Sequence, residues 1–166
     1  METKNLDIYG HEPISWERAR KKLETMETGG HMTCWLATAG ADGNPHLAGT
    51  GAVWADDKFY FVSGAATRKS RNVEQNPNCA MSVSLPGIDV VVQGRARRVT
   101  DRTTLERIVK LYVKLGWPAE AGDGVVTAPH SAPSAGPSPW NLYEIAPASA
   151  VGVASEEPHG ASRWTF

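Results

Sequence analysis

One stretch decides how the rest of the chain is read: Phe61-Val62-Ser63-Gly64-Ala65-Ala66-Thr67-Arg68-Lys69-Ser70-Arg71-Asn72-Val73. The apolar run from Phe59 to Val62 predicts a strand, and the Ser-Gly pair after it predicts a turn. Thr67 is a suitable N-cap for a short helix from Arg68 to Gln75, which the Asn-Pro pair that follows would end. The stretch therefore predicts a strand, a turn and a helix in immediate succession.

The charges at this helix start are unusual. A helix N-terminus carries partial positive charge and favours acidic side chains, yet this one begins with Arg68, Lys69 and Arg71. Free backbone N–H groups beside basic side chains form a phosphate site. A solvated basic turn explains the same residues. Charge alone leaves both interpretations open.

Composition fits one domain spanning residues 1–166. The chain has 166 residues, of which 21% are charged and 41% hydrophobic, as in ordinary globular proteins. It shows neither a membrane-spanning run nor a signal peptide, so we expect a cytoplasmic protein without a membrane partner. Residues 1–14 are expected to form a surface arm.

The cysteines and histidines predict no metal site. Cys34 and Cys79 each lie in an apolar stretch and are expected to be buried thiols. The five histidines show no paired ligand spacing: His11, His31, His46, His130 and His159.

The basic residues concentrate in the middle of the sequence. Between Thr67 and Lys110 nine residues are basic and four acidic, against a net charge of −1 for the whole chain. Such a segment is expected to form a local basic face, which suits an anionic ligand. Aromatic residues do not alternate with these basic ones, so no nucleic-acid partner is expected.

The hydrophobic pattern predicts a mainly β protein with peripheral helices. Helices are expected at 16–28, capped by Ser15 and stopped by Gly29-Gly30, and at 102–115, capped by Thr100-Asp101, besides the short one at 68–75. A long Pro/Gly loop is expected at 116–139. Six antiparallel strands are expected at 31–38, 46–54, 58–63, 78–85, 88–100 and 140–153, the last broken at Pro147. The Asp42-Gly43 pair between the first two predicts a hairpin turn. Such a set closes into a barrel or pairs with a second copy to cover its edges.

Two strands carry unusual residues. The strand 46–54 is built almost wholly of small residues, which indicates either close approach of a ligand or a bulge in tight packing. Gln93 stands among valines, which fits a hydrogen-bonding role or a solvated edge. At the C-terminus, Trp164 and Phe166 are expected to dock on a pocket or a partner chain.

The sequence contains no recognisable catalytic set of side chains. No Ser-His-Asp arrangement, Walker loop, Gly-x-Gly-x-x-Gly turn or close carboxylate pair is present. If the chain is an enzyme, a bound cofactor carries the chemistry, and the catalytic side chain stays unknown.

Three segments, NPHLAGTGAVW at 44–54, KFYFVSGAATRKSRNVEQNPN at 58–78 and VVVQGRARRVTD at 90–101, carry a family resemblance. They resemble the pyridoxamine 5′-phosphate oxidase-like split β-barrel flavoproteins. The closest likeness is to the flavin/deazaflavin oxidoreductase B group, many of which use coenzyme F420 instead of FMN. The resemblance runs from about residue 31 to residue 166. It implies a six-stranded antiparallel split β-barrel with peripheral helices.

The resemblance also implies a site. It implies a homodimer with two cofactor sites in clefts between the subunits, and Trp164 and Phe166 near the cofactor ring or the dimer seam. The strand 47–52 would lie along the ring, and the basic turn would hold the cofactor phosphate. The residues it implies for cofactor binding are Leu47, Ala48, Gly49, Thr50, Ala52, Ser63, Thr67, Arg68, Lys69, Arg71, Asn72 and Gln93.

By this resemblance the chain is an F420-dependent oxidoreductase that moves a hydride between the deazaflavin ring and a small conjugated substrate. The basic middle segment favours F420, which carries more negative charge than FMN. One alternative is an FMN-dependent oxidoreductase of the pyridoxamine 5′-phosphate oxidase type. Another is a non-catalytic protein that binds a flavin, a deazaflavin or haem.

Overall fold

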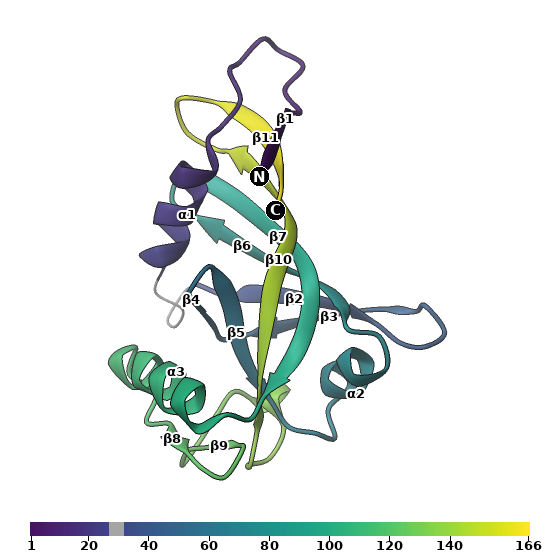
Figure 1. Cartoon of the computed structure of the whole chain (residues 1–166), viewed down its shortest axis with the longest axis vertical. Helices are drawn as coiled ribbons and strands as arrows, with labels where there is room; N and C mark the ends of the chain where they lie inside the picture. Colours follow the sequence, from purple (N-terminus) through teal and green to yellow (C-terminus); the bar gives the residue numbers. More distant parts are fainter. Residues whose placement is uncertain (27–31) are drawn as a thin grey trace.

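A computed structural model describes residues 1–26 and 32–166, and its main feature is a curved antiparallel sheet flanked by helices (Figure 1). The elements in chain order are β1 (Glu2–Asn5), α1 (Trp16–Glu24), β2 (Cys34–Ala39), β3 (Pro45–Thr50), β4 (Ala52–Ala55), β5 (Lys58–Ser63), α2 (Arg68–Gln75), β6 (Asn78–Leu85), β7 (Ile88–Val99), α3 (Arg102–Lys114), β8 (Glu120–Ala121), β9 (Val126–Thr127), the 3₁₀ turn η1 (Pro133–Ala135), β10 (Asn141–Ala154) and β11 (Gly160–Thr165).

The strand pairs form a circuit. β2 pairs with β3 and β6, β6 with β7, β7 with β10, β10 with β5, and β5 with β4. The circuit closes because β3 runs into β4 through the single residue Gly51. These antiparallel pairings confirm the predicted split-barrel fold class.

The strand predicted at 46–54 is divided in two, so the prediction of one continuous strand is wrong. Its first part pairs with β2, from Ala39↔Pro45 to Cys34↔Thr50, and its second part pairs with β5. Gly51 lies at the change of partner. A run of small residues packs weakly against any one neighbour, so the strand can leave one partner for another.

Both ends of the chain add strands that were not predicted. β1 pairs with β11, and β11 pairs with the second half of β10, which gives a sheet of nine strands in the described part of the chain. The predicted surface arm is thus partly a strand, although residues 2–5 are exposed. β10 is continuous through Pro147, where the register shifts between Pro147 and Ser149 instead of the strand breaking.

Alternate residues of β5 face two hydrophobic clusters. Phe59 and Phe61 lie in the cluster inside the barrel, while Tyr60 and Val62 lie in a second cluster with α3. All four side chains are buried. This explains why β5 reads as a continuous apolar run, because neither of its faces meets water.

The helices begin at the predicted caps. The side-chain oxygens of Ser15, Thr67 and Asp101 accept hydrogen bonds from the first turns of α1, α2 and α3. The first helix was predicted to reach Thr28, but it ends at Glu24. The predicted stop at Gly29-Gly30 and the predicted strand start at His31 lie outside the described residues.

The segment 116–139 is less irregular than expected. It contains the short hairpin β8–β9 and η1, so the prediction of a loop without regular elements is wrong. It folds back along the barrel, as Gly64 N–H donates to the Ala135 oxygen at 2.7 Å. No helix among residues 1–26 and 32–166 is long and apolar enough to cross a membrane.

Candidate functional site

The start of α2 is held by a network of hydroxyl groups. Thr67 Oγ1 accepts from Ser70 N–H at 3.3 Å, donates to the Gly64 oxygen at 2.9 Å and lies 2.7 Å from Ser63 Oγ. Ser63 and Ser70 are completely buried. The network therefore fixes where the first helical turn, with its basic side chains, lies against the sheet.

Lys69 is the unusual residue of this turn. Its side chain is buried, with 2% of the residue exposed, and its ammonium donates to the Ser134 backbone oxygen. Among the described residues no carboxylate lies within ion-pair distance of it. Burial lowers the pKa of Lys69 from its ordinary value. A buried cation without a counter-ion is unfavourable, so this position is suited to an anion that the chain does not itself supply.

Arg68 and Arg71 are exposed on the same turn. Arg71 donates to the Ala66 oxygen, and neither arginine forms an ion pair within the described chain. The other helix starts differ, because α1 has Glu17 in its first turn and α3 is capped by the carboxylate of Asp101. The α2 start is the one of the three whose cap and first turn carry no acidic group. Its positive charge is therefore left for a ligand.

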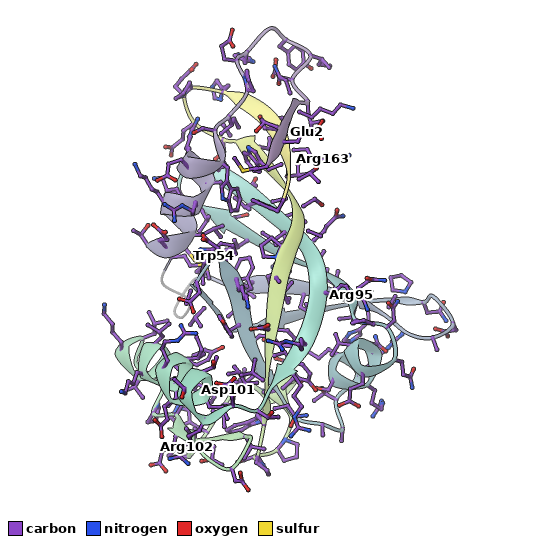
Figure 2. All side chains as sticks on the ribbon, in the orientation of Figure 1. Glu2, Trp54, Arg95, Asp101, Arg102 and Arg163 are labelled. Carbon is purple, nitrogen blue, oxygen red and sulfur yellow. The ribbon has the colours of Figure 1, made fainter. Side chains whose placement is uncertain are left out.

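The wider basic segment does not form one surface. Arg97 pairs with Glu144 at 2.8 Å, Arg107 with Asp56 at 2.6 Å and Arg102 with Glu106 at 2.5 Å. In Figure 2, Arg95 and Arg102 lie in different parts of the molecule, one along β7 and one at the start of α3. The expected basic face thus reduces to the α2 turn, and it no longer discriminates F420 from FMN by charge.

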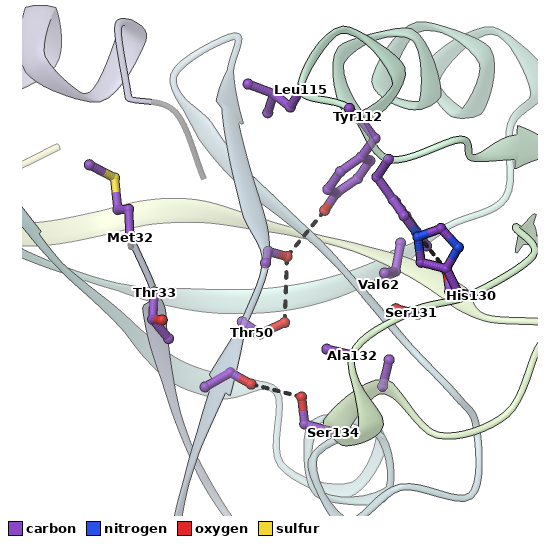
Figure 3. A pocket seen from close by; sticks show the side chains of 15 residues that line it. Met32, Thr33, Thr50, Val62, Tyr112, Leu115, His130, Ser131, Ala132 and Ser134 are labelled. Atoms are coloured by element: carbon purple, nitrogen blue, oxygen red, sulfur yellow. Dashed lines mark hydrogen bonds between the residues drawn. The ribbon is translucent and has the colours of Figure 1, made fainter. Parts of the chain in front are cut away.

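A cavity of about 560 Å³ lies beside Ser134, the residue whose backbone oxygen accepts from Lys69 (Figure 3). It is bounded by the end of β3, the end of α3 and the segment 130–135. The lining residues are Met32, Thr33, Gly49, Thr50, Gly51, Val62, Tyr112, Leu115, Gly116, Trp117, His130, Ser131, Ala132, Ser134 and Ala135. No carboxylate, lysine or arginine is among them, so the lining is apolar with hydroxyl and imidazole groups.

Ser134 joins the cavity to the basic turn. Its hydroxyl donates to the Gly49 oxygen at 3.0 Å, while its own backbone oxygen accepts from Lys69. Gly64 permits this approach, because a Cβ there would lie 2.9 Å from the Ala135 oxygen. The anion-binding candidate and the cavity are therefore two parts of one site.

Hydrogen bonds from two aromatic side chains hold the far wall of the cavity together. Tyr112 Oη lies 3.3 Å from the Gly51 oxygen and 3.2 Å from the Tyr60 oxygen, and burial raises the pKa of this phenol. Trp117 Nε1 donates to the His130 oxygen. Tyr112 therefore stays protonated and holds the strand junction at Gly51 instead of acting as a proton donor.

Some of the strand residues predicted to bind the cofactor line the cavity, and others do not. Gly49 and Thr50 line the cavity, and Leu47 and Ala48 precede them on β3. Ala52 lies beyond the strand junction with its side chain in the barrel core.

Of the polar residues predicted to bind the cofactor, three hold α2 in place and one lies elsewhere on the sheet. Ser63 and Thr67 support the α2 turn from below. Asn72 is buried and donates to Thr38 Oγ1 at 3.0 Å, which fastens α2 to β2. Gln93 lies on β7, separated from Leu47 by β6 and β2, and accepts from Ser149. Within one chain, Gln93 therefore does not reach the other predicted residues.

Sequence reasoning missed several residues of the site. Tyr112, Trp117, His130 and Ser134 come from the end of α3 and the loop after it, and His46 lies on β3 near the basic turn. A loop as long as 116–139 is usually functional or disordered, and that length was the available signal. The two C-terminal aromatics, in contrast, do not line the cavity.

Comparison with known proteins agrees with this fold. The profile of the pyridoxamine 5′-phosphate oxidase family matches residues 20–135. A search of curated proteins finds no match.

Solved structures share the fold at low sequence identity. A putative pyridoxamine 5′-phosphate oxidase from Listeria innocua is 20% identical, with 81% of this chain and 94% of that chain covered and a TM-score of 0.57. An F420 reductase is 24% identical, with coverage of 84% and 98% and a TM-score of 0.55. PhzG from Burkholderia lata, in complex with tetrahydrophenazine-1-carboxylic acid, is 15% identical, with coverage of 90% and 84% and a TM-score of 0.56.

The family match covers more than half of the chain, and the strand circuit that closes at Gly51 agrees with it. The chain belongs to the pyridoxamine 5′-phosphate oxidase family, with the split-barrel fold of its structural neighbours.

Proposed function

We propose that this protein is an F420-dependent oxidoreductase that transfers a hydride between the deazaflavin ring and a small conjugated substrate. The observation that carries a phosphate-bearing cofactor is Lys69, a buried ammonium that has no counter-ion in the described chain and bonds to a residue of the cavity wall, and the choice of F420 over FMN follows the F420 reductase that shares the fold. The family is named for an oxidase, and an F420 reductase shares the fold, which supports the oxidoreductase class.

The residues present fit a phosphate-bearing cofactor. Arg68 and Lys69 supply charge at a helix N-terminus, and Ser134 links Lys69 to the cavity wall at Gly49. The cavity lining offers apolar surface and backbone groups, which suit a flat ring. A bound F420 or FMN would supply hydride chemistry that no side chain here provides.

The chain's own residues would bind the cofactor, orient its ring and keep water away from the reacting atoms. Arg68 and Lys69 would hold the phosphate, and the backbone at Gly49 and Thr50 would flank the ring. Tyr112 keeps the strand junction in place through its hydroxyl. The apolar lining would exclude water from the reacting atoms.

Replacing Arg68 by alanine is expected to weaken cofactor binding tenfold to a hundredfold, the value of a charged hydrogen bond of about 1.5–3 kcal/mol. The matched control is Arg102→Ala, because Arg102 is the first residue of α3 as Arg68 is of α2, yet is paired with Glu106. Fluorescence titrations with F420 and with FMN measure both variants.

The same titrations, together with turnover assays on enones and quinones, separate the proposals. Binding of FMN but not F420 to the wild type would replace the F420 proposal by an FMN-dependent oxidoreductase. Tight binding of either cofactor without turnover of enones or quinones would point to a non-catalytic carrier. Equal affinities of Arg68→Ala and wild type would show the arginine to be solvated charge.

We further propose that the protein is a homodimer in which a second copy covers the outer face of the sheet. Trp35, Leu47 and Val153 are 48%, 62% and 48% exposed.

The strand register places these residues on one face of the sheet. The pairings Trp35↔Ser82, Ser82↔Val91 and Val91↔Val151 place Trp35 on the same sheet face as Val151 and Val153. Ala37↔Leu47 adds Leu47 to this face, and Gln93 lies on it too. An exposed apolar face of this extent supports an interface, across which Gln93 would approach the partner's site.

Leu47→Asp is expected to convert the dimer to a monomer of 17.9 kDa, because burying an unpaired carboxylate at the centre of an interface is strongly unfavourable. Sedimentation velocity measures the mass of both forms. Val113→Asp is the control, since Val113 is 50% exposed on α3, away from this face. A wild-type chain that sediments as a monomer at micromolar concentration would contradict the proposal.

A further inference from the structure

His46 lies on β3, directly opposite Thr38 on β2. Directly paired residues of antiparallel strands point to the same side of the sheet. Thr38 accepts a hydrogen bond from Asn72 of α2, so its side faces that helix. The imidazole of His46 is therefore on the side of the sheet that α2 covers.

The surroundings of this imidazole are unusual. Its Nδ1 atom is buried and has no hydrogen-bond partner in the chain as far as the structure describes it. The charged groups that act on it are Arg68 and Lys69, both from α2, and burial together with these two cations lowers the pKa of His46. The pKa of Asp42, in the turn between β2 and β3, is lowered mainly by hydrogen bonds from Asn44 and to a smaller extent by Arg68. The ring is thus neutral at neutral pH and carries one N–H.

The position of that N–H follows from burial. A buried N–H without an acceptor is rarer in proteins than a buried acceptor without a donor. Because Nδ1 is enclosed without a partner, the proton belongs on Nε2. His46 then offers one donor beside two cations, which is an arrangement that an anion completes.

We propose that His46 is a third ligand of the anion at the start of α2, donating its Nε2–H to a phosphate oxygen beside Arg68 and Lys69. The inference rests on the proposed function in that this anion is taken to be the cofactor's phosphate. It adds a strand residue to a site otherwise formed by a helix start. His46 stands on β3 three residues before Gly49, which lines the cavity, so this ligand would connect the phosphate position to the cavity through one strand.

Phosphate binding and ring NMR test this inference without any enzymatic turnover. Inorganic phosphate is titrated into the ¹⁵N-histidine-labelled protein in a phosphate-free buffer, and the His46 signals are assigned from their loss in His46→Gln. Phosphate is expected to shift the Nε2 resonance of His46. The resonances of His130 and His159 are expected to stay, because neither residue lies at the basic turn.

Two variants give the affinity. His46→Leu is expected to weaken phosphate binding about tenfold, whereas His46→Gln, whose amide N–H lies near the position of Nε2, is expected to stay within about threefold of wild type. Thermal melts establish that both variants fold.

Different results overturn different statements. If Arg68→Ala abolishes phosphate binding while His46→Leu binds like wild type and the His46 signals do not move, His46 is not a ligand and the proposed function stands. If phosphate, FMN and F420 all fail to bind the wild type, the anion site and the role of His46 are both wrong.

Discussion

Lys69→Met is expected to weaken cofactor binding about a hundredfold while leaving the apoprotein as stable as wild type or up to about 2 kcal/mol more stable. The two effects have one cause. The ammonium is buried and lacks a counter-ion among the described residues, so it destabilises the fold in the absence of an anion. Methionine fills a similar volume without charge, and the exposed Ser134 leaves its oxygen to water.

The pH dependence of stability provides an independent check. Burial lowers the pKa of Lys69 in the folded state, so in the range between that lowered pKa and about 10.4 the unfolded chain binds more protons than the folded one. The free energy of unfolding of the wild type therefore gains from this lysine as pH rises through that range. Lys69→Met has no such group, and the stability difference between the two proteins should narrow at alkaline pH.

Lys110→Met is the control for this experiment. Lys110 is an exposed lysine on α3, and its replacement should change stability by less than about 0.5 kcal/mol and leave cofactor affinity unchanged. Urea unfolding at neutral and alkaline pH measures stability, and fluorescence titration measures affinity. A loss of several kcal/mol in Lys69→Met would show that the ammonium stabilises the fold, and the argument for an anion at this position would be lost.

The sequence predicted helix starts and tight turns correctly, because these depend on residues that are neighbours in the chain. Thr67 caps α2 because its hydroxyl reaches Ser70 N–H, and an Asp-Gly turn joins β2 to β3 as expected. β1 and β11 were missed because their pairing joins the two ends of the chain, and the four residues of β1 are polar and exposed. The composition of such a segment does not indicate that it pairs with a strand more than 150 residues away.

The candidate site shows the same division. The basic turn was found from sequence because its charges contradict the helix dipole within a few residues. The opposite wall was not found, because Ser134 meets Gly49 across a separation of 85 residues. The nine basic residues between Thr67 and Lys110 were treated as one surface, yet folding distributes them over α2, β7 and α3. Proximity in sequence predicted proximity in space only within single elements.

Trp164→Ala is expected to lower the free energy of unfolding by about 3–5 kcal/mol, the cost of removing a fully buried large aromatic side chain. No part of Trp164 is exposed, its ring centroid lies 5.3 Å from that of Trp16, and its Nε1 donates to the Ile14 oxygen at 3.1 Å. A Cβ at Gly152 would come within 2.5 Å of Trp164 Cη2, so β10 has no side chain where the indole passes. Urea unfolding measures the change.

Phe166→Ala is the matched control, because Phe166 also packs on Trp16, with ring centroids 4.8 Å apart, but is 47% exposed. Its loss should cost no more than about 1 kcal/mol, since part of its surface already meets water. Neither aromatic lines the cavity, so Phe166→Ala should bind the cofactor like wild type. Equal losses of stability in the two variants would mean that Trp164 and Phe166 contribute alike, as residues packed on the surface of the barrel. A large difference would support Trp164 as a residue of the barrel core, whereas the family resemblance implies a place near the cofactor ring or the dimer seam.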